Sequence, residues 1–104
     1  MKKLSQKKLD GLIDEATIDC YDDYESRMGF YTMLEDNLSF PFKAKVVGEE
    51  VKIIGIASEN ERIDAICQRN GKKYSVDILN IDYNPSEVIG SEWIEAYRKW
   101  SEAT

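Results

Sequence analysis

The chain has 104 residues, 42% of them hydrophobic and 33% charged, which is enough for one domain, residues 1–104, with a packed core. The formal net charge of −6 argues against nucleic-acid binding, because that binding depends on Lys and Arg neutralising phosphates. The absence of histidine removes the commonest general base and the commonest transition-metal ligand. No apolar run is long enough to cross a membrane.

Three further features bear on the compartment and on catalysis. Cys20 and Cys67 form no CxxC motif, so we expect free thiols in a reducing compartment. Met1 to Lys3 resemble the start of a signal peptide, but polar residues follow them, which predicts a cytoplasmic protein. The chain contains no glycine-rich phosphate loop and no GxSxG elbow. We therefore expect that it is not an enzyme.

Apolar spacing predicts two helices in an acidic part at about residues 5–38. Leu9, Leu12, Ile13 and Ala16 follow the i, i+3, i+4, i+7 pattern of the first helix. In the second helix an apolar stripe steps by three and four, through Tyr21, Tyr24, Met28, Tyr31, Leu34 and Leu38. Phe30 and Met33 fall outside this stripe, so we expect the second helix to be buried on more than one face. Pro41 favours an extended segment after it.

From about residue 43 to residue 83 the apolar period changes to two, which predicts short strands. The strands are expected at 44–47, 51–56, 63–68 and 73–78, and a short piece at 79–83 is a candidate fifth strand. We expect a break at residues 48–50, a bulge at Gly55 and a type I′ hairpin at Asn70-Gly71.

A last helix is expected at about residues 91–102. Ser91 is its candidate N-cap, and its apolar face carries Trp93, Ile94, Tyr97 and Trp100. The predicted class is α+β, with N-terminal helices, a C-terminal helix, and between them three to five antiparallel strands in a small curled sheet or an SH3-like barrel.

The negative charge is concentrated in residues 10–36, where nine acids face Arg27 alone. Along the second helix these acids form a group at its start (Asp19, Asp22, Asp23, Glu25) and a pair at its end (Glu35, Asp36). The two groups are roughly 21 Å apart at 1.5 Å per residue, so one ion cannot bridge them. By extrapolation along the stripe, Glu35 is expected to point into the stripe, so either the helix ends before it or its carboxylate has a partner.

Clustered carboxylates without imidazole or thiol partners suit calcium, which takes six to eight oxygen ligands. No EF-hand spacing is present. Acids in a first helical turn also cap the helix and favour its dipole, so the first group has a structural interpretation as well. That interpretation does not cover Glu35 and Asp36, because the dipole opposes acids at a helix C-terminus.

Two segments, Asp19 to Glu25 and Met28 to Ala44, closely resemble the CcbP-type calcium-binding protein family. The run LEDNLSFPF is the most specific part, and the similarity covers about half of the chain. The resemblance implies a small bacterial cytoplasmic protein that binds Ca²⁺ through surface acids without EF-hands, as a buffer or regulator of free calcium. The implied ligands are Asp22, Asp23, Glu35 and Asp36, followed by Asp19 and Glu25.

An alternative from a different class remains open. An acidic SH3-like module can bind a basic protein partner, or mimic nucleic acid toward one, by charge alone. A calcium response in thermal stability separates the two, because a ligand that binds only the native state raises the melting temperature.

Overall fold

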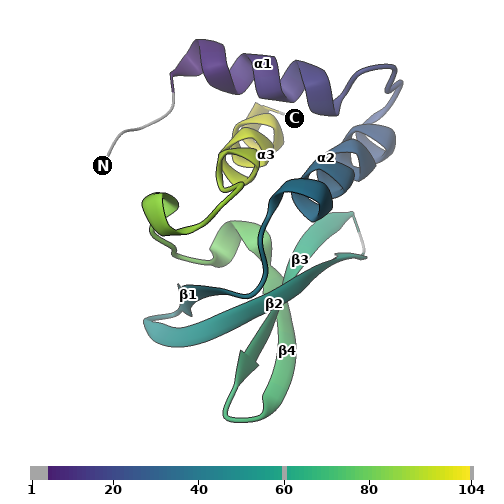
Figure 1. Cartoon of the computed structure of the whole chain (residues 1–104). Helices are drawn as coiled ribbons and strands as arrows, with labels where there is room; N and C mark the ends of the chain where they lie inside the picture. The colour runs from purple at the N-terminus through teal and green to yellow at the C-terminus, as the bar shows by residue number, and fades with distance from the viewer. Residues whose placement is uncertain (1–4, 60, 104) are drawn as a thin grey trace.

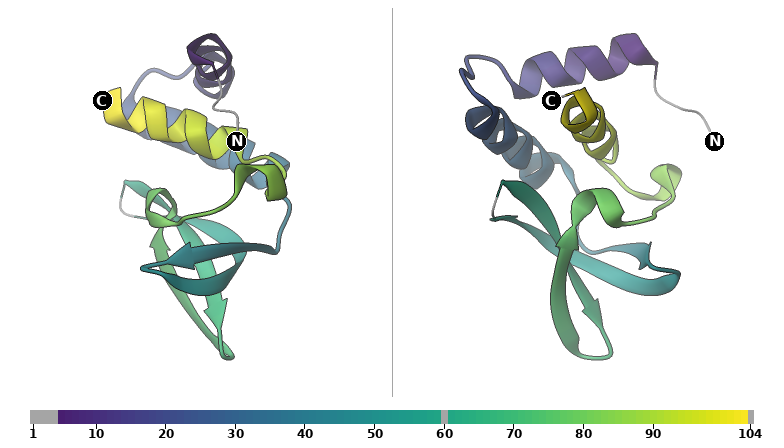
Figure 2. Two further views of the ribbon diagram at one scale, coloured as in Figure 1. Left: turned by 90° about the vertical axis from the view of Figure 1, so that its left-hand side faces the viewer. Right: turned by 180° about the vertical axis from the view of Figure 1, so that it is seen from behind.

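Three helices stack on one side of a twisted antiparallel sheet (Figure 1). The computed structural model describes residues 5–59 and 61–103. The elements are α1 (Gln6–Ala16), α2 (Asp23–Asn37), β1 (Phe42–Val46), β2 (Glu49–Glu59), β3 (Arg62–Arg69), β4 (Lys72–Asp77), η1 (Ile78–Asn80), η2 (Pro85–Glu87) and α3 (Glu92–Ala103). Figure 2 shows α1 as the outermost helix, lying across α2 and α3 on the side away from the sheet. No described helix is long and apolar enough to cross a membrane.

The sheet has the order β1-β2-β3-β4, and every neighbouring pair is antiparallel. The predicted hairpin at Asn70-Gly71 is confirmed, with φ of 52° and 77° at its two turn residues. The predicted irregularity at Gly55 is also confirmed, because the register with β3 shifts between Ile53 and Gly55. Val47 and Gly48 alone make the first turn, so the predicted break at residues 48–50 is too long and β2 begins at Glu49.

The candidate fifth strand is reduced to a single bridge. After η1, Asp82 exchanges two backbone hydrogen bonds with Lys45 of β1, with N–O distances of 2.7 and 2.8 Å. The neighbouring Tyr83 hydroxyl donates to Glu95 of α3, which ties this segment to the helical layer. The sheet is therefore open rather than a closed barrel, and the predicted α+β class with a small curled sheet is confirmed.

The core lies between the sheet and the two inner helices. Phe30 and Leu34 of α2, Ile53 and Ile63 of the sheet and Ile94 of α3 are all fully buried. In α3 the predicted apolar face is confirmed, since Trp93, Ile94 and Tyr97 are buried and Trp100 packs against the core. Ser91 precedes α3 as predicted, but its hydroxyl donates to the Pro85 carbonyl at 3.2 Å instead of capping the helix.

The predicted apolar stripe of α2 is correct in its second half, where Leu34 and Leu38 are buried and Tyr31 packs against the core, and wrong at its start. The expected burial of the helix on more than one face is confirmed by Phe30 and Met33. Tyr21 and Tyr24 are 89% and 64% exposed, whereas Phe30, placed outside the stripe, is fully buried. The helix begins only at Asp23, and its buried residues are Ser26, Phe30 and Leu34, which recur every four residues. The tyrosines at the start of the predicted stripe made the true apolar face hard to recognise.

Two glycines fix the position of α2 by close approach. A Cβ on Gly29 would lie 2.0 Å from the Ala16 carbonyl oxygen, so the end of α1 rests directly on the middle of α2. A Cβ on Gly90 would lie 2.2 Å from the Asn37 carbonyl oxygen, so the segment before α3 rests on the end of α2. Gly90 also has a positive φ of 86°, which favours glycine. Neighbouring backbone therefore holds α2 at its middle and at its C-terminus.

Candidate metal site

All of the predicted ligand residues are exposed, and they occupy the two ends of α2. Because α2 runs from Asp23 to Asn37, the two groups are separated by nearly its whole length, as the sequence predicts. Within residues 5–59 and 61–103, no three Asp, Glu or Cys side chains are close enough together to hold a metal ion. Any bound cation must therefore draw further oxygen ligands from backbone, amide groups or water.

At the start of α2, two of the four acids accept hydrogen bonds from backbone N–H groups. Asp22 is the N-cap, and its Oδ1 accepts a hydrogen bond from Glu25 N at 2.8 Å. Glu25 in turn accepts one from Tyr21 N through Oε2, at 3.3 Å. This reciprocal arrangement resembles a capping box, and the positive end of the helix dipole favours both carboxylates. The capping interpretation thus applies to Asp22 and Glu25.

The other two acids of this group lie free on the surface. Asp19 has a positive φ of 59° in the turn that precedes α2, and Asp23 is the first residue of the helix. In the described part of the chain neither side chain forms an ion pair.

At the other end of α2, Glu35 and Asp36 both face solvent. The expectation that Glu35 points into the apolar stripe is wrong, because the stripe itself is shifted toward Phe30. The next residue, Asn37, donates its side-chain N–H to the Met33 carbonyl at 2.8 Å, which leaves its amide oxygen as an acceptor.

Backbone oxygens add to this end of the helix. Leu38 N bonds to the Leu34 carbonyl, but Ser39 N turns away to the Ile89 carbonyl. The last carbonyls of α2 therefore lack partners within the helix, and they form the negative end of its dipole. Residues 35–37 thus carry carboxylate, amide and carbonyl oxygens at a helix end whose field attracts cations. The sequence analysis missed Asn37 and the carbonyls, since no residue type signals a free carbonyl.

Tyr31, one helical turn before Glu35, reports on this end of the helix. Its hydroxyl lies 3.5 Å from the Ile56 carbonyl oxygen, and its side chain is half-buried. Burial, and after it the neighbouring Glu35 carboxylate, raise the pKa of Tyr31 above its ordinary value. A cation that neutralises Glu35 must therefore lower the pKa of Tyr31.

None of the predicted ligand carboxylates takes part in the four ion pairs of the described residues. Those pairs join Arg62 to Asp64, Arg69 to Glu49, Arg98 to Glu95 and Lys99 to Asp10. Asp64 is buried and lies 2.7 Å from Arg62 Nε, so it is no ligand candidate. The acids of α2 therefore have no cationic side chain as an ion-pair partner among the described residues.

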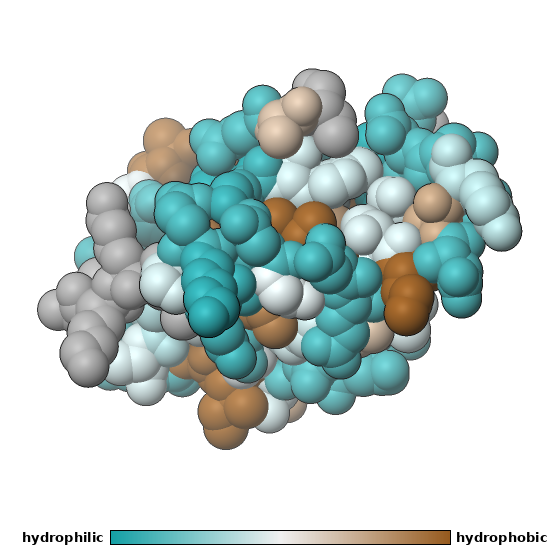
Figure 3. Space-filling view, turned by 90° about the horizontal axis from the view of Figure 1, so that it is seen from above, coloured by the Kyte–Doolittle hydropathy of each residue, from teal (hydrophilic) through white to brown (hydrophobic). Residues whose placement is uncertain are grey.

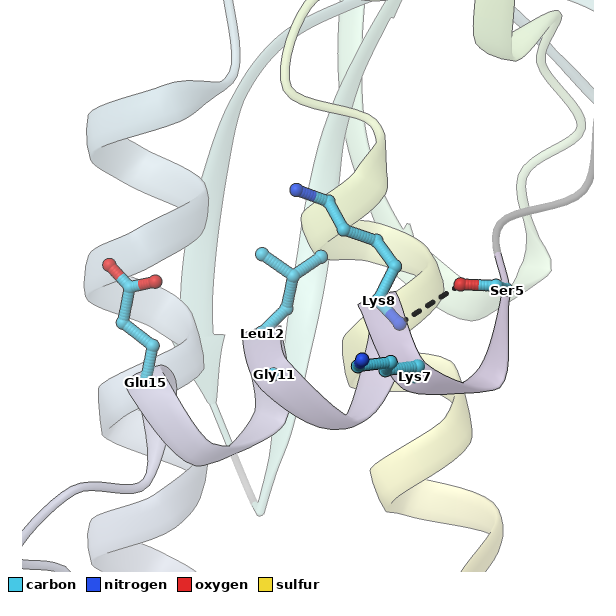
Figure 4. Close-up of a pocket in the computed structure, with 6 residues that line it drawn as sticks. All are labelled: Ser5, Lys7, Lys8, Gly11, Leu12 and Glu15. Carbon is cyan, nitrogen blue, oxygen red and sulfur yellow. Dashed lines mark hydrogen bonds between the residues drawn. The ribbon is translucent and has the colours of Figure 1, made fainter.

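A shallow hollow of about 510 Å³ lies on α1 and is a poor cation site. Figure 4 shows its lining side chains in a row, with Glu15 at one end and Lys7 and Lys8 toward the other. Ser5 is already used there, because its Oγ accepts from Lys8 N at 3.1 Å. Two ammonium groups beside one carboxylate repel a cation.

A family model for CcbP, described as calcium binding, matches residues 11–101. The crystal structure of Anabaena CcbP has a TM-score of 0.78 and 22% sequence identity, covering 96% of this chain and 94% of that chain. A calcium binding protein in its calcium-binding form has a TM-score of 0.76 and 22% identity, covering 99% and 97%. No curated protein matches the chain. The structures confirm the fold, and the family match confirms the resemblance predicted from the sequence, with Ca²⁺ as the ion.

Proposed function

The chain belongs to the CcbP family of calcium-binding proteins, and on that premise we propose that it binds Ca²⁺ through the acids of α2 and buffers or regulates free calcium in the cytoplasm. The observation that carries the proposal is the exposure of these acids without any ion pair in the described residues. Two free cysteines, one of them fully buried, support a reducing compartment.

The C-terminal end of α2 is the primary site in this proposal. Glu35 and Asp36 supply charge, while Asn37 and the last helix carbonyls supply neutral oxygens. At this end the dipole raises the energy of the empty carboxylates and lowers that of a bound cation. The first group (Asp19, Asp22, Asp23, Glu25) contributes a weaker site, because Asp22 and Glu25 already cap the helix.

The exposed arrangement sets the expected affinity and selectivity. It lacks the ligand loop that an EF-hand folds around its ion, so we expect micromolar or weaker binding of Ca²⁺. Mg²⁺ should compete poorly, because it demands rigid octahedral geometry and retains its waters.

The test compares two double variants with the same charge change. Glu35→Gln with Asp36→Asn removes the proposed site, and Asp14→Asn with Glu15→Gln removes an exposed pair at the C-terminal end of α1. Melting curves are recorded with a chelator and with millimolar Ca²⁺, and calorimetry gives the affinity. A site filled at 100 times its Kd stabilises the native state by about 2.7 kcal/mol. We expect the Glu35/Asp36 variant to lose most of this response and the α1 variant to keep it.

Three outcomes contradict the proposal. Equal losses in both variants mean that total charge, and not a site, attracts calcium. A Glu35/Asp36 variant that unfolds without calcium means that these carboxylates hold the turn into β1. Nanomolar affinity, or equal responses to Mg²⁺ and Ca²⁺ at matched concentration, contradicts a loose oxygen site.

A second candidate function is binding of a basic protein partner. It is favoured by exposed aromatic side chains that lie among the acids before and at the start of α2.

A further inference from the structure

Three large apolar side chains are exposed where α1 leads into α2. Ile18, Tyr21 and Tyr24 are 71%, 89% and 64% exposed and lie within seven residues of one another. With Asp19 and Asp23 we call them the turn patch. Large apolar side chains gathered on the surface of a monomer typically mark an interaction site, whereas single ones are ordinary.

Local hydrogen bonds order the backbone of the turn patch. Cys20 N bonds to the Thr17 carbonyl at 3.0 Å, and Thr17 closes the end of α1 through Ile13. The reciprocal bonds of the α2 cap fix the backbone from Tyr21 onward. Because the backbone is ordered in advance, a partner loses little entropy on binding.

The negative charge of the turn patch favours a basic partner. Asp19, Asp22, Asp23 and Glu25 alternate with the apolar side chains along residues 18–25. The nearest base along the chain, Arg27, has its guanidinium 5.5 Å from the Trp100 ring centre and is thus turned inward. Figure 3 looks down on α1 and shows apolar atoms set among hydrophilic ones near the end where α1 meets α2. Tyrosine faces attract ammonium and guanidinium groups, and the carboxylates pair with them.

We infer that the turn patch docks a basic polypeptide segment that also carries an apolar side chain. Lys or Arg of the segment would lie between the carboxylates and the tyrosine rings, while its apolar side chain packs on Ile18. A symmetric contact with a second copy is disfavoured, because it brings two acidic patches of molecules with a net charge of −6 together. The patch is small, so the complex is a transient one. This inference rests on the second candidate function and not on calcium binding.

The experiment uses the full chain in chelator, so that calcium plays no part. The probe is a synthetic peptide of alternating Lys and Leu, titrated while backbone amide shifts are recorded. The control peptide has Gly in place of every Leu. We expect shifts confined to about residues 18–25, and binding about tenfold weaker for the Gly peptide.

Matched variants test the side chains. Tyr21→Ser with Tyr24→Ser should weaken binding of the Leu peptide about tenfold and leave the melting temperature unchanged, since both rings are exposed. Val47→Ser with Ile89→Ser removes two other exposed side chains, 94% and 70% exposed, and should leave binding unchanged. The Glu35/Asp36 variant should still bind the peptide, which separates this inference from the calcium site.

Each contrary result overturns the inference. Equal binding of the Gly peptide means unspecific attraction between charges. Equal losses in the two serine variants, or shifts outside the turn, place binding elsewhere. If the wild-type chain sediments as a dimer and the variant with Tyr21→Ser and Tyr24→Ser as a monomer, the turn patch binds a second copy of the chain.

Discussion

The two ends of α2 carry the same kinds of side chain in opposite electrostatic surroundings. At the N-terminal end, the helix dipole stabilises the carboxylates, and Asp22 and Glu25 cap the helix. At the last end, the dipole opposes Glu35 and Asp36, and no ion pair in the described residues compensates them. An acidic stretch that looks uniform in sequence thus divides into acids that the helix dipole stabilises and acids that it destabilises.

The largest expected effect comes from disturbing the contact between α1 and the middle of α2, between the two ends. Gly29→Ala places a methyl group against the Ala16 carbonyl, so α1 must move away from α2. The helix-propensity gain of about 1 kcal/mol is smaller than the overpacking cost, and we expect a net loss of about 2 kcal/mol in urea unfolding. The matched control is Gly11→Ala, which meets nothing within 4 Å and should be neutral or stabilising. Calcium affinity at Glu35 and Asp36 should survive in the folded variant; its loss would mean that the two ends are coupled.

The cap gives the next largest effect. Asp22→Ala removes the acceptor for Glu25 N and should cost about 1 kcal/mol of unfolding free energy. Asp23→Ala, one residue later, removes an exposed carboxylate with no cap role and should cost less. Both are measured by thermal unfolding in chelator. Equal costs would show that charge, and not the hydrogen bond, matters at this end.

The sequence predicted the fold where local chemistry decides the structure. Asn70-Gly71 gave a type I′ hairpin because both residues tolerate positive φ, and the alternation after it gave β4. The start of the α2 stripe was predicted wrongly, because tyrosines fit either a core or a surface and only packing with α1 and α3 decides which. The close approaches at Gly29 and Gly90 are tertiary, and the sequence shows only that a glycine is present.

The positions of the acids along α2 were predictable from the sequence, but their hydrogen bonds and electrostatic surroundings were not. Composition and spacing placed the acids at two ends of one helix, which the structure confirms. Which of them cap depends on where the helix begins, at Asp23 and not at Tyr21. The Glu35 carbonyl lacks its helical partner because Ser39 N bonds to the Ile89 carbonyl, a contact between distant segments.

At the C-terminal end of α2 we expect a smaller change in the free energy of unfolding, opposite in sign to that of Asp22→Ala. Asp36→Asn removes a charge that the dipole opposes, so the protein without calcium should gain about 0.3–1 kcal/mol of stability. The same variant should lose calcium stabilisation. Thermal unfolding in chelator and in millimolar Ca²⁺ gives both values. A loss of stability in chelator would indicate a structural hydrogen bond to this carboxylate.

The smallest expected effect is a change in the pKa of Tyr31. Burial is the first cause of its raised pKa, followed by the charge of Glu35 and by a hydrogen bond to Glu35, so neutralising Glu35 should lower the pKa only in part. Because the raised pKa stabilises the native state below pH 10, this contribution is lost as the pH rises through the Tyr31 pKa. Tyrosine Cζ chemical shifts, followed by pH titration in carbonate-free buffer, should show a lower Tyr31 pKa with calcium than with chelator. Tyr83 is the internal control, because its acidic neighbour is Glu95 on α3. Glu35→Gln should lower the Tyr31 pKa in chelator and abolish its dependence on calcium. A Tyr31 pKa that does not change with calcium, together with a Tyr83 pKa that does, would place the ion near α3.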